Sequence, residues 1–330
     1  METFSYVKAP SIDKALASAP QGKFIAGGTT LVDLMKLNVE TPKTLVDINL
    51  LPLDKIEKLP DGGLRIGAMV RNSDLAWNAE VQKSYTVLSQ ALLSGASPQL
   101  RNMATTGGNL LQRTRCMYFR EPDAGTPGGY GCNKRTPGSG CAAMDGYNRV
   151  HAILGTSEHC IATHPSDMCV AMAALEAVIH VEGPKGKRTI AFADFHKLPG
   201  DTPQIETALE PGELVTYVVL PKPVEGAKSV YLKLRDRASY EFALASAAVV
   251  ARVEGGHIRY IRVTFGGIGT KPWRSHEAEA ALMGKPAHPA TFKAAAEAAL
   301  AKAKPHKDNA FKVELAKRCL VRTLKTATTA

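Results

Sequence analysis

The sequence predicts an α+β protein made of two or three structural units. Over residues 1–222, short apolar strands alternate with short helical patterns. Over residues 223–330, three longer strand patterns precede three helical patterns. A polar insert at about residues 113–163 is rich in Gly, Pro and Arg and has no apolar period. With 330 residues the chain is long enough for more than one hydrophobic core.

Composition and charge exclude several functional classes. The net charge is +10, but Lys and Arg are scattered and only 6% of residues are aromatic, so we expect no nucleic-acid partner. A phosphate-bearing cofactor or an acidic partner subunit fits this charge better. The longest apolar runs, such as Phe242–Val250, are too short to cross a membrane. Residues Met1–Tyr6 lack the pattern of a signal peptide, so we expect a cytoplasmic chain without its own export signal.

The first unit contains a strand, a glycine turn and a helix in direct succession. A helix is predicted at Ile12–Ala17 and a short apolar strand at Lys23–Ala26. The strand runs into Gly27–Thr30, and apolar residues then recur at helical spacing over Leu31–Met35. This arrangement directs backbone N–H groups at an anion, and the threonines add hydroxyl donors. The turn is therefore a candidate phosphate loop, with an ordinary strand-to-helix turn as the alternative.

A second glycine-rich loop follows further elements of the same kind. Strands are predicted at Thr44–Ile48 and Leu64–Met69, and helices at Ser73–Val81 and Tyr85–Leu93. The loop Thr105–Asn109 comes next and again combines glycine with threonine. Two such loops favour a diphosphate ligand held from two sides, although this glycine pair could equally serve a tight bend.

Four of the six cysteines lie in the polar insert. An insert of this kind cannot bury a core of its own, so something else must order it. A chain without a signal peptide argues against disulfides. The four cysteines form no CxxC motif, and a [4Fe–4S] cluster, a structural zinc ion and no metal at all remain open. These candidate ligands are Cys116, Cys132, Cys141 and Cys160.

The other cysteines and the basic residues of the insert have different contexts. Cys169 and Cys319 fall in apolar helical patterns and are predicted to be small core residues. Basic side chains near the insert cysteines would offset the charge of four thiolates, or else form a solvated face. These basic residues are Arg113, Arg115, Lys134 and Arg135.

Regular structure resumes after the insert. A buried helix is predicted at Met168–Ala174 with Asp167 near its N-cap, followed by strands at Ala177–Val181 and Gly212–Leu220. The segment Pro221–Pro223 is the predicted domain boundary.

The last third predicts an antiparallel sheet of three strands covered by helices on one face. The turn Glu254–His257 joins the second and third strands as a hairpin. No catalytic triad, paired-carboxylate site or HExxH motif is present, so the chain is interpreted as a cofactor carrier. The strands are Ser229–Arg235, Phe242–Val253 and Ile258–Phe265, and the helices are His276–Met283, Pro289–Ala303 and Asn309–Thr326.

Five motifs occur in the order found in a known family. They are Phe24–Leu31, Arg101–Asn109, His164–Asp167, Lys233–Leu244 and Gly266–Arg274. Together they resemble the FAD-binding (medium) subunits of the molybdenum hydroxylase, or xanthine dehydrogenase, family. The resemblance covers essentially the whole chain.

The cysteine insert resembles one branch of that family. Arg113–Cys116, Cys132–Arg135, Gly138–Cys141 and Cys160–His164 are similar to the FAD subunit of the bacterial aldehyde oxidoreductase heterotrimer. In that branch the insert carries a [4Fe–4S] cluster, so the resemblance favours iron–sulfur over zinc. The longer segment Phe119–Gly131 departs from the pattern and leaves the loop conformation open.

The resemblance implies a fold and a set of cofactor contacts. An FAD-binding (PCMH-type) domain would occupy residues 1–222, with α/β subdomains at about 1–55 and 56–222, and residues 223–330 would form the C-terminal α+β domain. The two glycine loops would hold the FAD diphosphate, Asp167 would contact the ribityl or ring region, and Lys233 would lie near the flavin. The implied FAD contacts are Lys23, Phe24, Ile25, Ala26, Gly27, Gly28, Thr29, Thr30, Leu31, Thr106, Gly107, Gly108, Asn109, His164, Asp167 and Lys233.

The resemblance also implies a role in electron transfer. The chain would be an oxidoreductase subunit in a heterotrimer with a molybdopterin-binding large subunit and a [2Fe–2S] small subunit. Aldehyde would be oxidised on the large subunit, and electrons would pass through the [2Fe–2S] clusters to FAD and on to an external acceptor. Related trimers are exported on a partner's signal, so a periplasmic location is an alternative to the cytoplasm.

Two other functions compete with this one. The first is a zinc-stapled nucleotide-binding module without redox activity. The second is a self-sufficient flavin oxidase, for which the sequence offers no acid or base on the substrate side.

Overall fold

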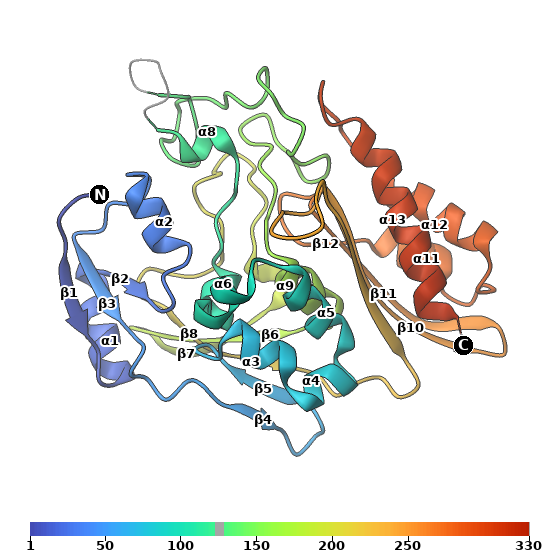
Figure 1. Cartoon of the computed structure of the whole chain (residues 1–330), viewed down its shortest axis with the longest axis horizontal. Helices are drawn as coiled ribbons and strands as arrows, with labels where there is room; N and C mark the ends of the chain where they lie inside the picture. The colour runs from blue at the N-terminus through green and yellow to red at the C-terminus, as the bar shows by residue number, and fades with distance from the viewer. Residues whose placement is uncertain (123–128, 330) are drawn as a thin grey trace.

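The computed structural model describes residues 1–122 and 129–329, which form three β-sheets with helices around them. The N-terminal sheet and the C-terminal domain lie at opposite ends of the molecule, with a second sheet between them (Figure 1). Part of the segment Phe119–Gly131, whose conformation the sequence left open, lies outside the described residues. No helix in the described ranges is long and apolar enough to cross a membrane.

The first sheet is parallel, with strand order β1-β3-β2. Its second and third strands and both helices were predicted to within two residues. The first strand was not predicted, because all four of its residues are exposed and no apolar alternation marks it. The elements are β1 Ser5–Lys8, α1 Ile12–Ser18, the 3₁₀ turn η1 Ala19–Gln21, β2 Lys23–Ile25, α2 Leu31–Lys36 and β3 Thr44–Asp47.

The second sheet is antiparallel, with strand order β4-β5-β8-β6-β7. Its core joins apolar residues of β5, β6 and β8 to those of helices α5 and α9. The elements are β4 Ile56–Lys58, β5 Leu64–Gly67, α3 Asn72–Trp77, α4 Ala79–Ser84, α5 Thr86–Ser94, α6 Pro98–Met103, α7 Thr106–Leu110, α9 Asp167–Ala174, β6 Val178–Gly183, β7 Gly186–Ala191, α10 Phe192–Phe195 and β8 Leu214–Leu220.

The prediction of a single helix over Ser73–Val81 is wrong. The helix is interrupted at Asn78, whose backbone is extended. The Asn78 side chain accepts hydrogen bonds from the amides of Glu80 and Val81, so it caps a second helix. An Asn side chain that satisfies amides in this way favours a new helix start over a continuous helix.

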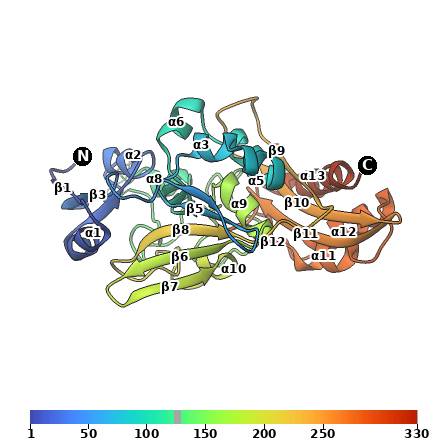
Figure 2. The same cartoon turned by 90° about the horizontal axis from the view of Figure 1, so that it is seen from below.

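The C-terminal domain contains a four-stranded antiparallel sheet of order β12-β11-β10-β9, with helices α11, α12 and α13 packed on it. The three long strands were predicted; the fourth, β12, was not, because two residues show no periodicity. Helices α5 and α9 lie between this sheet and the second sheet (Figure 2). The elements are β9 Lys228–Leu234, β10 Ala245–Glu254, β11 His257–Gly266, β12 Trp273–Arg274, α11 His276–Leu282, α12 Pro289–Leu300 and α13 Phe311–Thr328.

The cysteine insert contains one short helix, α8 Met117–Arg120, and is otherwise irregular in its described part. The expectation that it buries no core of its own is wrong. A small apolar cluster combines three of its cysteines with aromatic and aliphatic side chains, and Leu34 of α2 completes it. The fully buried ring of Phe119 is part of this cluster. The cysteines are therefore core residues of the insert as well as candidate ligands.

A buried lysine joins the insert to the C-terminal domain. Lys312 of α13 is fully buried, and its Nζ donates to the carbonyl oxygens of Val150, His151 and Gly267 at 3.0, 3.0 and 2.7 Å. An ammonium group has three donors, so all three are satisfied. The lysine therefore holds the end of the insert against the C-terminal sheet.

We expect Lys312→Met to destabilise the protein by about 2–4 kcal/mol, because it removes three hydrogen bonds of a buried group. The Val150 and His151 carbonyls keep bonds from Thr163 and Asn309, whereas the Gly267 carbonyl has no other donor within the described residues. Lys325→Met, an exposed position on the same helix, is the matched control and should change stability little. Thermal unfolding of the two variants tests this, and equal midpoints would contradict the role of Lys312.

Candidate functional site

Two cavities meet where the Gly27–Thr30 turn approaches the end of α6 and the second glycine-rich loop, Thr105–Asn109. A smaller one of about 160 Å³ is lined by all residues from Lys23 to Leu31, and a larger one of about 240 Å³ reaches α9 and β9. Thr29, Thr30 and Gly108 line both, so the cavities are continuous. A Cβ atom on Gly27 would lie 1.9 Å from the carbonyl oxygen of Met103. Only glycine permits this approach, which brings the two glycine loops to one cavity.

The first loop offers unoccupied donors. In the part of the chain that the structure describes, no protein acceptor takes the backbone amides of Gly27, Gly28, Thr29 or Thr30. Gly28 has φ +70°, a conformation that turns the chain between strand and helix and favours glycine. Free amides ahead of a helix bind anions, so this turn fits a diphosphate.

The second loop contributes differently from the prediction. Thr105 caps α7 by accepting from the Gly108 amide, while the amides of Thr106 and Gly107 donate to the carbonyls of Val70 and Ala68. Thr106 is fully buried, and its hydroxyl also donates to Val70. These donors therefore hold the loop on the second sheet, whereas Gly107, Gly108 and Asn109 line the cavities.

Asp167 and Lys233 come together in the wall of the larger cavity. Ser166 caps α9 and Asp167 is the first helical residue. One Asp167 carboxylate oxygen accepts from the Lys233 ammonium at 2.8 Å, and the other accepts from the Tyr231 hydroxyl. Only 3% of the Lys233 side chain and 9% of the Asp167 side chain are exposed. A strand lysine that could have been a surface residue is thus part of a buried ion pair.

Several cavity residues were missed by sequence reasoning. They come from α6, from the start of the insert and from the loop between β9 and β10. All but Gln112 lie within the sequence motifs named above, but none was among the implied FAD contacts. The loop contributes Tyr240, whose φ of +52° is unusual for a residue with a side chain. Phe242 lies under the Arg115 guanidinium at 4.9 Å from ring centroid to Cζ. The missed residues are Arg101, Gln112, Arg115, Arg237, Tyr240 and Phe242.

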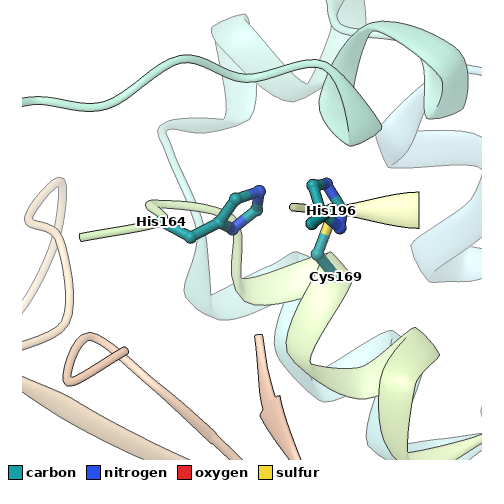
Figure 3. A group of neighbouring side chains, drawn as sticks. All are labelled: His164, Cys169 and His196. Carbon is teal, nitrogen blue, oxygen red and sulfur yellow. The ribbon is translucent and has the colours of Figure 1, made fainter. Parts of the chain in front are cut away.

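His164 lines neither of these two cavities, and its ring lies beside the His196 ring and the Cys169 side chain (Figure 3). The possible ligand atoms of these three side chains are within 4.8 Å of one another. His196 shares a hydrogen bond of 2.9 Å with the Leu110 carbonyl. Burial lowers the pKa of both imidazoles and raises the pKa of the Cys169 thiol to about 12, so all three are uncharged at neutral pH.

The four insert cysteines line one common cavity. Burial raises the pKa of Cys116 to about 12, that of Cys160 to about 11, and that of Cys141 as well. Cys160 accepts from the Ala162 amide at 3.4 Å, and Cys132 pairs with Cys141 in a short antiparallel bridge. Buried thiols with raised pKa values lose their protons when a metal replaces them. The four side chains therefore form a thiolate donor set suited to a soft metal.

The basic residues around the cysteines mainly tie the insert to its surroundings. Arg113 pairs with Glu40 and Glu206, and Arg115 pairs with Asp33. Arg135 donates to backbone carbonyls, including that of Tyr118. Lys134 is the one whose charge lowers the pKa of a cysteine, Cys160. The prediction that basic residues offset thiolate charge thus fits Lys134. The three arginines instead form ion pairs or backbone hydrogen bonds that hold the insert in place.

The chain is similar to known proteins over almost its whole length. Residues 2–223 match the family model of the FAD binding domain in molybdopterin dehydrogenase, and residues 230–327 match that of the CO dehydrogenase flavoprotein C-terminal domain. The chain is 53% identical over 328 residues to the aldehyde oxidoreductase FAD-binding subunit PaoB of Escherichia coli K12, with 98% of each chain covered.

More distant relatives extend the similarity. The chain is 29% identical over 285 residues to the glyceraldehyde dehydrogenase medium chain of Sulfolobus acidocaldarius, covering 86% of this chain and 82% of that one. A solved structure of carbon monoxide dehydrogenase from Hydrogenophaga pseudoflava matches with a TM-score of 0.77 and 28% identity, over 99% of this chain and 97% of that one.

We expect Gly27→Ala to weaken ligand binding in the two cavities about tenfold or more. The added methyl group must displace the Met103 carbonyl, and such overpacking costs about 1–3 kcal/mol. The visible absorbance of bound flavin in the purified protein measures the effect. Flavin content equal to wild type would show that the loops can separate without loss of the site.

His196 makes stability depend on pH. Its ordinary pKa of 6.5 falls to about 4 through burial, so the unfolded chain takes up a proton that the folded chain refuses. The free energy of unfolding therefore falls as pH drops from about 6.5 towards 4. Between about pH 7 and pH 5, the free energy of unfolding of His196→Phe should fall by about 1–2 kcal/mol less than that of the wild type. Urea unfolding at both pH values tests this, with exposed His276→Phe as control.

Proposed function

The chain belongs to the FAD-binding subunits of the molybdenum hydroxylase family, and we propose that it is the FAD- and [4Fe–4S]-carrying electron-transfer subunit of an aldehyde oxidoreductase. The 53% identity to an aldehyde oxidoreductase subunit over nearly the full length supports this substrate class. The partners would be a molybdopterin-binding large subunit and a [2Fe–2S] small subunit in a heterotrimer. An export signal on a partner subunit would then determine whether the complex is cytoplasmic or periplasmic.

The continuous pair of cavities fits FAD. The free amides of Gly27–Thr30 would bind the diphosphate, and Gly107 and Gly108 would close the cavity from the opposite loop. The larger cavity would hold the flavin ring beside Asp167 and Lys233. Thr106 and His164 lie outside both cavities and would act by supporting their walls.

The ion pair of Asp167 and Lys233 would fix one edge of the flavin site. Because both side chains are buried and Tyr231 holds the second carboxylate oxygen, the pair cannot rotate freely. Such a fixed pair orients a polar ligand edge without reorganisation. We infer that Tyr231 is a positioning residue, since it contacts Asp167 and does not line the cavity.

The role in electron transfer follows from the cofactor. A bound flavin accepts single electrons and releases them singly or in pairs, so it suits the exit from a [2Fe–2S] chain to an external acceptor. The protein's contribution is to bind and orient the ring. Aldehyde would be oxidised on the large subunit, and the isolated chain should not turn over aldehyde.

The four insert cysteines would hold the [4Fe–4S] cluster. The names of the relatives above mention no such cluster, so this part of the proposal depends on the cysteines themselves. A zinc ion with four thiolates at about 2.3 Å would draw the sulfur atoms to about 4 Å from one another. The four insert cysteines share a cavity, but no three of their sulfur atoms all lie within 4.8 Å of one another. Within the described residues, the group of three possible ligands that does meet this distance is His164, Cys169 and His196. The wider spacing supports a polynuclear cluster over zinc.

We propose that the chain divides into an FAD-binding domain at residues 1–222 and a C-terminal domain at residues 223–330, with the insert at about 113–163. The first two sheets lie before residue 223, and every strand of the third sheet lies after it.

Cys132→Ser should remove the cluster iron from the purified complex and lower the thermal midpoint by on the order of 5 °C, because a hydroxyl is a poor ligand for iron–sulfur clusters. Cys319→Ser is the control, since Cys319 is buried in the C-terminal core far from the insert cysteines and should leave iron unchanged. Iron analysis and the visible spectrum are the measurements. Unchanged iron in Cys132→Ser would refute the ligand set, and a colourless wild type with stoichiometric zinc would favour the zinc-stapled module.

A further inference from the structure

A buried histidine contacts one of the proposed cluster ligands. His151 Nε2 lies 3.1 Å from Cys116 Sγ, and His151 is only 1% exposed. Sequence reasoning did not select this residue. It follows Val150 in the insert with no ligand spacing to mark it, and 35 positions separate it from Cys116.

The direction of this hydrogen bond follows from the two ring nitrogens. Nδ1 of His151 is buried and has no hydrogen-bond partner in the described part of the chain. A metal-bound thiolate accepts hydrogen bonds and cannot donate one. A neutral imidazole carries one proton, on one of its two ring nitrogens. That proton belongs on Nε2, where it has an acceptor.

The C-terminal domain fixes the position of the imidazole. The backbone carbonyl of His151 accepts from Lys312 Nζ at 3.0 Å and from Asn309 Nδ2 at 3.4 Å. Nearby, the side chain and amide of Asn148 exchange hydrogen bonds with the backbone and side chain of Asp308. The histidine is thus held by a domain that contributes none of the four cysteines.

The Cys116 side of the site also faces a cavity. A cavity of about 160 Å³ is lined by Cys116 and His151 together with Arg115, Glu241 and Phe242, and these last three also line the larger flavin cavity. Cys116 is therefore the proposed ligand whose sulfur can change its hydrogen bonds and its contact with solvent through this cavity. Both quantities set the reduction potential of a cluster.

We propose that His151 donates a hydrogen bond from Nε2–H to the Cys116 thiolate and thereby raises the reduction potential of the cluster. The inference rests on the proposed cluster. A hydrogen bond to a ligand sulfur stabilises the reduced state more than the oxidised state, because the reduced cluster carries more negative charge. His151 is a positioning and tuning residue and not a ligand.

The test is a redox titration of the assembled complex, monitored by electron paramagnetic resonance of the reduced cluster. In His151→Phe the midpoint potential should move to a more negative value while iron content stays at the wild-type level. His151→Gln keeps an N–H donor near the position of Nε2 and should restore most of the wild-type potential. His276→Phe is the control, since this exposed histidine belongs to the C-terminal domain and does not line the cysteine cavity, so it should leave the potential unchanged.

Two outcomes overturn the inference while leaving the cluster in place: a wild-type potential in His151→Phe, or a Gln variant shifted as far as the Phe variant. Wild-type protein without iron overturns the proposed cluster instead. A measurement on the wild type covers the case in which His151→Phe does not assemble. Isotopically labelled histidine should show hyperfine coupling to the reduced cluster, and the coupling should disappear in His151→Gln. Absence of that coupling in the wild type also overturns the inference.

Discussion

The contact between Gly27 and the Met103 carbonyl is the constraint on which the cofactor site depends. The first sheet carries the loop with free amides, and the second unit carries the cavity wall, so neither forms the site alone. A side chain at position 27 would separate the two loops. Close approach of backbones uses space that only glycine leaves free, and the free amides opposite make that space useful for an anion.

The insert is ordered by three kinds of interaction that act on different parts of it. Arg113, Arg115 and Arg120 pair with acidic residues of the first unit and of the segment before β8. The apolar cluster with Phe119 gives it a small core, and Lys312 fixes its far end. Each is modest in size, so the proposed thiolate-bound cluster would supply the largest single term in the folding of this segment.

Much of the fold was predictable from local patterns, because strands with apolar runs and helices with capping residues carry their own signals. The two glycine loops and the four insert cysteines could be selected from their residue types, and the structure places the loops around one cavity and the cysteines around another. Tyr231, Lys312 and His151 were not, since each is a single polar residue whose burial results from packing between distant segments. The strand β1 was missed because it is exposed on all four residues, and pairing with β3 determines its structure more than its own composition does.

The two ends of the insert meet at the flavin cavity, which raises the question of how far cluster and flavin depend on each other. The Ser166 hydroxyl donates to Asn109 Oδ1 at 2.6 Å, and this bond closes the base of the insert without any cysteine. Asp167 is held by Lys233 and Tyr231, which also lie outside the insert. Arg115, which is next to Cys116, lines both the flavin cavity and the cavity beside Cys116, as do Glu241 and Phe242. Coupling between cluster and flavin should therefore pass through these three residues, of which Arg115 is held by its ion pair with Asp33, and the rest of the flavin site should remain formed when the insert is disordered.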